Sequence, residues 1–332
     1  MLSSLRSPFR SACTLLCTLF LSLSAIAQPK PASAYPTKPI KIVVPYAPGG
    51  TSDILARTLG QKLTETWGQT VLVENKAGAG GNIGADFVAK AAADGYTLLL
   101  ADIGSLAIGP SVYLTLPFDP AKEFAPVTMV AYSPHILVVH PSIKANTVKE
   151  LVDYAKANAG KMNYATSGVG GANHLAGVEF ANSTGVQWTY VPYKGGAQAI
   201  ADVASGQSNV MFNGMLATYP HVKSGNLKII AVSGAARMSS IPDVPTVAES
   251  GVPGFETGSW QGVLAPLGTP PEIVMKLNSE LARILSTAEM KEKLLLQGAE
   301  VRTNSPAAFG AFISKEKDRW AKVVKGAGIK IE

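Results

Sequence analysis

The stretch Pro45-Tyr46-Ala47-Pro48-Gly49-Gly50-Thr51-Ser52-Asp53 decides the fold. It joins an apolar run, residues 40–44, to a segment, 53–67, whose apolar residues recur at helical spacing. A buried strand therefore turns through glycines into a helix, with Thr51 and Ser52 as cap candidates. The turn leaves backbone N–H groups and the positive end of the helix dipole facing one point, which is a seat for an anion. A tight turn with no binding role is the alternative.

The same pattern continues along the chain. A strand at 71–74 enters a second glycine-rich loop, a helix follows at 83–92, and a strand at 96–101 ends at Asp102. Right-handed crossovers make these strands parallel, so their three following loops emerge at one sheet edge. From residue 133 the order of strand, glycine-rich loop and helix repeats, with loops at 166–173, 192–196 and 213–214. Two such sheets would enclose a cleft between their loops.

The C-terminal part returns to helices, expected at 271–285, 290–297 and 306–325, with an edge strand near 299–301. We expect the chain to cross back to the first half around residues 255–264. The fold class is therefore α/β, with two doubly wound domains around a central cleft. Domain 1 is discontinuous, 35–131 and 255–332, and domain 2 spans 132–254.

Residues 1–27 have the pattern of a cleaved export signal. Arg6 and Arg10 precede an apolar stretch that ends in Ala25-Ile26-Ala27, a small-x-small cleavage pattern. The apolar stretch is too short and too interrupted for a membrane anchor, the alternative interpretation. Both cysteines of the chain lie inside this signal, so the mature protein has no thiol chemistry. We expect a periplasmic protein cleaved near Ala27.

Composition narrows the function classes further. The chain has 332 residues, 47% hydrophobic and 16% charged, which suits an ordinary globular protein. Its formal charge of +6 falls by two, to +4, when the two signal arginines are removed. Because basic residues do not form runs interleaved with aromatics, we expect no nucleic-acid partner.

Cofactor and catalytic motifs are absent or incomplete. The loop Gly78-Ala79-Gly80-Gly81-Asn82-Ile83 has an isoleucine where the dinucleotide fingerprint needs its third glycine. A phosphate-binding Gly-Lys-Ser/Thr and a Gly-x-Ser-x-Gly elbow are missing, and the four histidines show no zinc spacing. We therefore expect no cofactor, no metal and no enzyme activity. A secreted hydrolase or isomerase of small carboxylates, acting through Asp53, His174 or Ser167, is the alternative.

A few aromatic and titratable residues fall in or near the expected cleft. Tyr46, Tyr193 and Trp260 are candidate pocket walls, with a core position as the alternative for each. His174 begins a helix after a glycine-rich loop and could reach a ligand, or could be a partly buried structural histidine. His135 and His140 bracket a strand and are interpreted as structural.

Several long motifs resemble one known family. They are Tyr35-Pro36-Thr37-Lys38-Pro39-Ile40, residues 44–53, Val73-Glu74-Asn75-Lys76 with its glycine-rich loop, Val191-Pro192-Tyr193-Lys194-Gly195-Gly196, and Pro242-Asp243-Val244-Pro245-Thr246-Val247-Ala248-Glu249. The chain resembles the Bug (TctC-like) receptors, which are periplasmic solute-binding proteins of tripartite tricarboxylate transporters. The resemblance covers nearly all of the mature chain.

The resemblance implies a type II-like periplasmic binding fold that closes on a small carboxylate. It implies that backbone amides and waters hold the carboxylate, through Ala47, Gly49, Gly50, Thr51, Ser52 and Asp53 of the first loop and Gly78, Ala79, Gly80 and Asn82 of the second, and Tyr46 beside them is a candidate pocket wall. It implies that Ser105, Ser167, His174, Tyr193 and Asn213 read the rest of the ligand. The implied partners are membrane transporter subunits, or alternatively a sensor kinase, and the expected state is a monomer.

One position departs from the family pattern. Family members commonly carry aspartate where this chain has Asn213. A neutral amide loses attraction for an ammonium group and tolerates a second carboxylate. Amino acids are therefore expected to be poorer ligands than plain carboxylates.

Overall fold

The computed structural model describes residues 35–327, so the predicted export signal lies outside the described residues. The strands of this part are β1 (Ile40–Val44), β2 (Val71–Asn75), β3 (Thr97–Asp102), β4 (Phe124–Val139), β5 (Asn163–Thr166), β6 (Thr189–Pro192), β7 (Val210–Gly214), β8 (Lys228–Val232), β9 (Gly258–Pro266) and β10 (Glu300–Val301). Within the described residues they join into one ten-stranded mixed sheet, in the order β2-β1-β3-β9-β4-β7-β5-β6, with β8 and β10 also paired to β4.

The helices of this part are α1 (Thr51–Trp67), α2 (Asn82–Ala89), α3 (Gly109–Val112), α4 (Val148–Ala157), α5 (Ala172–Thr184), α6 (Gly196–Ala204), α7 (Met215–Lys223), α8 (Pro271–Ser286), α9 (Ala288–Leu296) and α10 (Pro306–Ala327). A 3₁₀ turn, η2 (Ala79–Gly81), precedes α2, and a π-helical turn, η3 (Gly104–Ile108), precedes α3. No helix in the described range has the length and apolarity needed to span a bilayer.

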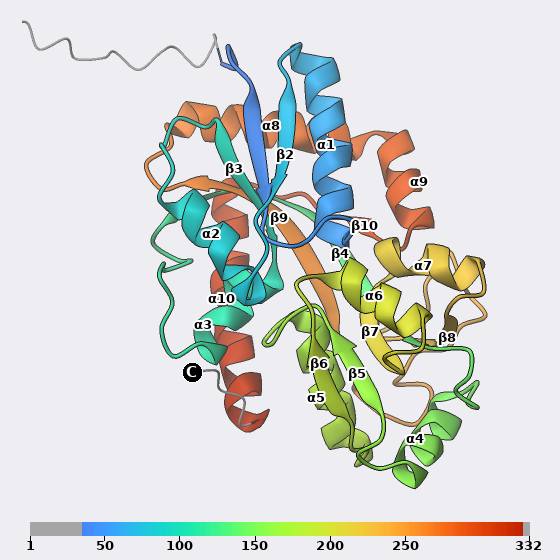
Figure 1. The fold of residues 1–332 in the computed structure, drawn as a ribbon. Helices are drawn as coiled ribbons and strands as arrows, with labels where there is room; N and C mark the ends of the chain where they lie inside the picture. Colours follow the sequence, from blue (N-terminus) through green and yellow to red (C-terminus); the bar gives the residue numbers. More distant parts are fainter. Residues whose placement is uncertain (1–34, 328–332) are drawn as a thin grey trace, which may run out of the picture. The chain divides into compact units, whose positions relative to one another are not determined.

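Helices cover both faces of the sheet because its strands are apolar on both sides. In β1, Ile40, Ile42 and Val44 pack with α1 and α8, whereas Val43 packs on the opposite face with α2 and α10. In the second half, α4 and α5 pack on one face of β5 and β7, and α6 and α7 pack on the other face (Figure 1). The predicted α/β, doubly wound class is therefore confirmed.

The parallel arrangement expected for the first three strands is confirmed. β1 pairs in parallel with β2 and with β3, so the loops after all three strands lie at one edge. In the second half β5 pairs in parallel with β6 and β7. The expected edge strand near 299–301 is β10, which pairs with β4.

The sheet differs from the expected pair of separate sheets at β4 and β9. β4 is 16 residues long and begins at Phe124, ahead of the repeat that we expected from residue 133, and β9 pairs with both β3 and β4. The full length of β4 was not predicted because the strand contains Pro126 and Pro134, and proline normally marks an edge strand or the end of a strand. The register with β9 shifts beside Pro126, which lets the strand continue. The predicted boundary at 131/132 falls inside β4, and the division into two domains stays a prediction.

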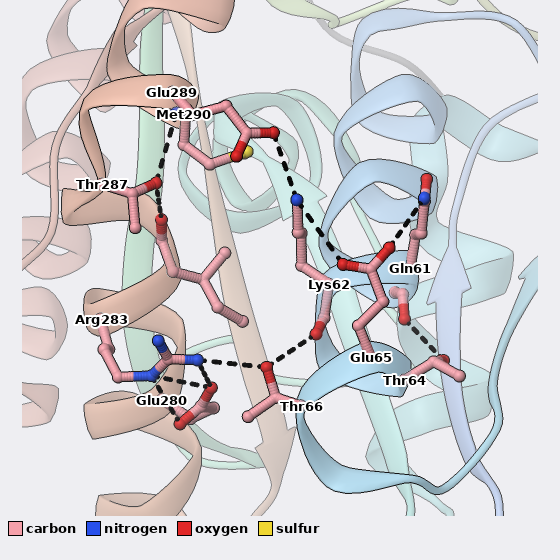
Figure 2. Close-up of polar contacts among 12 residues, drawn as sticks. Gln61, Lys62, Thr64, Glu65, Thr66, Glu280, Arg283, Thr287, Glu289 and Met290 are labelled. Atoms are coloured by element: carbon pink, nitrogen blue, oxygen red, sulfur yellow. Dashed lines mark hydrogen bonds and ion pairs between the residues drawn. The ribbon is translucent and has the colours of Figure 1, made fainter.

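A polar network connects α1 to the C-terminal helices (Figure 2). Lys62 of α1 lies 3.2 Å from Glu289 of α9, and Arg283 of α8 donates to the Thr66 hydroxyl at 3.1 Å. These side chains are partly solvent-exposed, and such pairs contribute about 0–1 kcal/mol each. The attachment of α8 to the first half therefore depends mainly on apolar residues such as Leu277 and Leu281, which are buried against the side chains of α1.

Close packing of α10 on β9 gives a testable prediction. An alanine Cβ at Gly262 would lie 2.1 Å from the ring of buried Phe309. Gly262→Ala is therefore expected to lower the free energy of unfolding by about 1–3 kcal/mol in urea titrations. In the Phe309→Ala background the same change should cost much less, because the obstructing ring is gone. Equal costs in the two backgrounds would show that this contact does not limit the position.

Two buried histidines predict a pH dependence of stability. Burial lowers the pKa of His135 on β4 and of His174 on α5 to about 4, so both are neutral in the native protein at pH 7. The unfolded chain takes up these protons below about pH 6.5, so stability is lost as the pH falls. Each histidine should cost about 2 kcal/mol of unfolding free energy between pH 7 and pH 5.

The variant His174→Gln separates this effect from general acid unfolding. His174 Nδ1 accepts a hydrogen bond from the Gly170 N–H at 3.1 Å, and a glutamine oxygen offers an acceptor without a titrating proton. Denaturant titrations at pH 7 and pH 5 should show a smaller loss in the variant than in the wild type. An identical loss in both would rule out His174 as a contributor.

Candidate functional site

A cavity lies where the loops at the strand ends of both halves of the chain meet. Its volume is about 50 Å³, room for roughly four water-sized groups. The described residues that line it are Tyr46, Gly50, Thr51, Ser52, Asp102, Ser133, His135, Ser167, Gly171, Ala172, Asn173, Gly196, Asn213, Gly214, Ser259 and Gln261. None of these is a lysine or an arginine. We call this space the central cavity.

Four helices begin at the central cavity. Gly50, Thr51 and Ser52 belong to the start of α1; Gly171, Ala172 and Asn173 to that of α5; Gly196 to that of α6; and Gly214 to that of α7. None of these four N-termini has a side-chain cap, whereas threonines cap α4 and α9 away from the cavity. Uncapped first turns leave N–H donors and positive partial charge available to an anion.

The two long strands supply the rest of the wall. Ser133 and His135 come from β4, and Ser259 and Gln261 from β9, where Ser133 lies opposite Ser259. His135 is 2% exposed, and its Nδ1 lies 3.3 Å from the Thr257 hydroxyl. We expected His135 to be purely structural, but it also contributes to the cavity wall. Gln261 could not be found from the sequence, because β9 was not expected to be a strand.

One acid lines the central cavity. Asp102, at the end of β3, accepts hydrogen bonds from the Tyr46 hydroxyl at 2.5 Å and from the Gly104 N–H at 2.9 Å. Burial raises the pKa of Asp102, and these hydrogen bonds offset part of that rise. Both bonds end at Oδ1, so this oxygen is already satisfied by protein donors. In the sequence its position after a buried strand was the only signal.

An outer cavity of about 330 Å³ adjoins the central one, and Tyr46 and Ser167 line both. Gly78, Ala79, Gly80 and Tyr193 line only the outer cavity. The second glycine-rich loop therefore lines the outer cavity and not the central one, and its contact with a ligand stays a prediction. Gly84, in the first turn of α2, serves packing: a Cβ there would lie 2.7 Å from the Pro45 backbone, so the glycine allows α2 to approach the first loop.

Loops from the two halves of the chain touch above these cavities. The Ala47 N–H donates to the Lys194 carbonyl at 3.3 Å, and the Tyr113 hydroxyl donates to the Val169 carbonyl at 3.3 Å. The Ala47 N–H is therefore occupied by protein and is not free for a ligand.

Six of the predicted site residues line the central cavity: Tyr46, Gly50, Thr51, Ser52, Ser167 and Asn213. Six others line neither cavity: Ala47, Gly49, Asp53, Asn82, Ser105 and His174. Ser105 is completely buried, and Asn82 is 4% exposed.

Asp53 and Gly49 hold the first turn of α1 together. The Gly49 N–H and the Arg57 guanidinium both donate to Asp53 at 2.9 Å, and the Asn75 amide donates at 2.9 Å. Burial raises the pKa of Asp53, but these hydrogen bonds outweigh it and keep the pKa below its ordinary value. Asp53 thus orients the loop, while the Gly49 N–H that we expected at the ligand is used internally.

His174 and Tyr193 also have partners of their own. The His174 ring packs edge-on against Tyr190, with ring centroids 4.9 Å apart, and Tyr193 donates to Asp202 at 2.5 Å. The structural alternative for His174 therefore agrees better with its position. Tyr193 keeps a wall position in the outer cavity.

Asn173 was the binding candidate most clearly missed. Its Oδ1 accepts from the Ser167 N–H at 3.3 Å and from the Ser167 hydroxyl at 2.9 Å. Its Nδ2 is buried and has no hydrogen-bond partner among the described residues. The sequence places Asn173, a polar residue, in the first turn of a helix after glycines, which is a position typical of ligand contacts. The prediction named its neighbour His174 instead.

Comparisons with known proteins agree with this architecture. Residues 55–329 match the family model described as the tripartite tricarboxylate transporter family receptor, TctC. The protein BugT of Bordetella pertussis is 38% identical over 315 residues, which is 95% of this chain and 97% of BugT.

Two solved structures of Rhodopseudomonas palustris proteins are also similar. Rpa4515 with adipate has a TM-score of 0.88 and 39% identity, covering 90% of this chain and 100% of that one. MatC with bound malate has a TM-score of 0.83 and 31% identity, covering 87% and 100%. The fold is thus that of periplasmic solute-binding proteins, and the chain belongs to the TctC family of tripartite tricarboxylate transporter receptors.

Proposed function

We propose that this receptor captures a small organic carboxylate in the central cavity and delivers it to the membrane subunits of a tripartite tricarboxylate transporter. The family is one of periplasmic binding proteins, and the sequence carries an export-signal pattern at residues 1–27. We also propose that the protein acts in the periplasm, as a monomer, after the signal is removed near Ala27.

The meeting of four uncapped helix N-termini carries the proposal. An anion at this point would be held by backbone N–H groups and by aligned dipoles, with no side-chain cation. The hydroxyls of Thr51 and Ser52 add neutral donors around the same space. Such an arrangement favours a carboxylate over a neutral or cationic group.

The two cavities suggest the form of the ligand. The central cavity has room for a carboxylate and a few further atoms, so the rest of a longer ligand would lie in the outer cavity. Adipate and malate, bound by the two structural relatives, are both dicarboxylates. We propose a dicarboxylic or aromatic carboxylate, with amino acids disfavoured because Asn213 is neutral.

The alternative of a hydrolase or isomerase has less support from the geometry. The Ser167 hydroxyl donates to Asn173, the His174 Nδ1 accepts from a backbone N–H, and Asp53 is paired with Arg57. The three residues therefore do not form a nucleophile, base and orienting acid in contact. A receptor should return a bound ligand unchanged, which mass spectrometry of the ligand recovered after incubation can check.

We further propose that the ligand is enclosed by movement of residues 132–254 relative to 35–131 and 255–332. β4 and β9 run between these parts, and the bonds from Ala47 to Lys194 and from Tyr113 to Val169 join them over the cavity. Closure would bury the carboxylate in a medium of lower dielectric, where the helix dipoles act more strongly, and would change the outer surface presented to the membrane partner.

Binding should be visible as thermal stabilisation. A carboxylate present at one hundred times its dissociation constant is expected to add about 2.7 kcal/mol to the unfolding free energy. The measurement is a thermal shift of the purified protein against a panel of mono- and dicarboxylates, aliphatic and aromatic. Absence of any shift across the panel would contradict the proposal.

Two variants at Gly50 test the seat itself. Gly50 has a φ of −81°, which any residue can adopt, and an alanine Cβ at this position would have no neighbour closer than 3.9 Å. Gly50→Ala should therefore fold and bind nearly as the wild type does, whereas Gly50→Leu should fold but lose binding, because its side chain fills the central cavity. Binding retained by a folded Gly50→Leu protein would remove the start of α1 from the mechanism.

A further inference from the structure

The central cavity contains an amide oxygen whose orientation is fixed and which has no donor. Asn213 Nδ2 donates to the Thr218 hydroxyl at 2.9 Å, and that hydroxyl donates its single proton to the Gly214 carbonyl at 2.8 Å. Thr218 can therefore only accept from Asn213, so the amide must present Nδ2 to Thr218. Asn213 Oδ1 then lies on the other side and makes no hydrogen bond within the described chain.

Asn213 lies close to the proposed carboxylate seat. A Cβ built on Gly196 would be 3.2 Å from Asn213 Oδ1, and one built on Gly50 would be 3.9 Å from the Gly196 nitrogen. The start of α6 thus lies close to both the Asn213 amide and the start of α1, and all three line the central cavity. A ligand whose carboxylate sits at α1 would place its neighbouring carbon atoms beside Asn213.

Two further amides in the same wall are buried and incompletely paired. Gln261 is 1% exposed and Asn173 is 3% exposed. Gln261 Nε2 donates to Ser259 at 3.1 Å while its Oε1 has no partner, and Asn173 Nδ2 has none either, in the part of the chain that is described. Buried amide atoms without partners cost free energy, so a bound molecule that supplies those hydrogen bonds gains affinity.

We propose that Asn213, with Gln261, selects carboxylates that carry a neutral hydrogen-bond donor, a hydroxyl group, next to the carboxylate. This inference rests on the proposed function and names the ligand class of the same site. The hydroxyl proton is accepted by an amide oxygen, while Asn173 Nδ2 donates to an oxygen of the ligand. A hydroxyl group, unlike an aliphatic carbon, is both donor and acceptor and so satisfies both kinds of amide atom.

An ammonium group fits this wall less well than a hydroxyl group. The oxygens available at Asn213 and Gln261 are neutral, and the nearby helix N-termini carry positive partial charge that repels a cation. The one carboxylate in the wall, Asp102, is already bonded to Tyr46 and Gly104. A 2-hydroxy acid is therefore preferred over the corresponding 2-amino acid.

The test compares ligands that differ at one substituent. Malate, succinate and aspartate share a four-carbon dicarboxylate chain and carry a hydroxyl, a hydrogen and an ammonium group at carbon 2. Calorimetric titration of the wild-type protein should give an affinity for malate at least about tenfold higher than for succinate or aspartate. Equal affinities for malate and succinate, or a preference for aspartate, would overturn the inference while leaving carboxylate binding intact. Failure of all three ligands, together with the wider carboxylate panel, would overturn the proposed function and this inference with it.

Two variants assign the preference to the residues. In Asn213→Ala and in Gln261→Leu the ratio of the malate affinity to the succinate affinity should fall toward one, because only malate loses an acceptor for its hydroxyl proton. Because succinate binding reports on folding and on the carboxylate seat, it serves as an internal control in each variant. Equal losses for malate and succinate in both variants would show that the two amides support the wall and do not read a hydroxyl group.

Discussion

The absence of side-chain caps on four converging helices is the constraint on which the rest of this structure depends. α1, α5, α6 and α7 all begin at the central cavity without a capping side chain. Their first N–H groups need acceptors, and a small anion can serve several of them at once. The sheet provides this convergence in two steps. β5, β6 and β7 are parallel, so α5, α6 and α7 start at one edge. The antiparallel pairs β3–β9, β9–β4 and β4–β7 make these strands run opposite to β1, so their carboxyl ends face the end of β1 where α1 starts.

The surroundings of the cavity are arranged to keep those N–H groups available. The Asp53 carboxylate does not cap α1. It accepts hydrogen bonds from Arg57, Gly49 and Asn75 and so holds the first loop in place. Asp102 is likewise bonded to Tyr46 and Gly104. Both acids therefore accept hydrogen bonds from the protein, and the other residues of the wall present neutral donors and acceptors to a ligand.

The sequence allowed the fold class and the first loop to be predicted, because glycine-rich turns after apolar runs have a local cause. Gly50, Thr51 and Ser52 line the central cavity as expected, whereas the second glycine-rich loop does not. Glycines that allow close packing, such as Gly84 against Pro45, look the same in a sequence as glycines that cradle a ligand. Gln261 could not be identified, since its position depends on the pairing of β9. Asn173 had a sequence signal in its place after glycines, but only the hydrogen bonds of its amide distinguish it from His174 beside it.

The central claim is that helix N-termini hold a carboxylate without the help of a cationic side chain. The most direct measurement compares, by calorimetric titration, the tightest-binding dicarboxylate with its diamide, which keeps the shape and removes the negative charge. Charge-assisted hydrogen bonds are about twice as strong as neutral ones, so the diamide should bind at least about 100-fold more weakly. Affinities within about threefold of each other would contradict an anion seat at these helix N-termini.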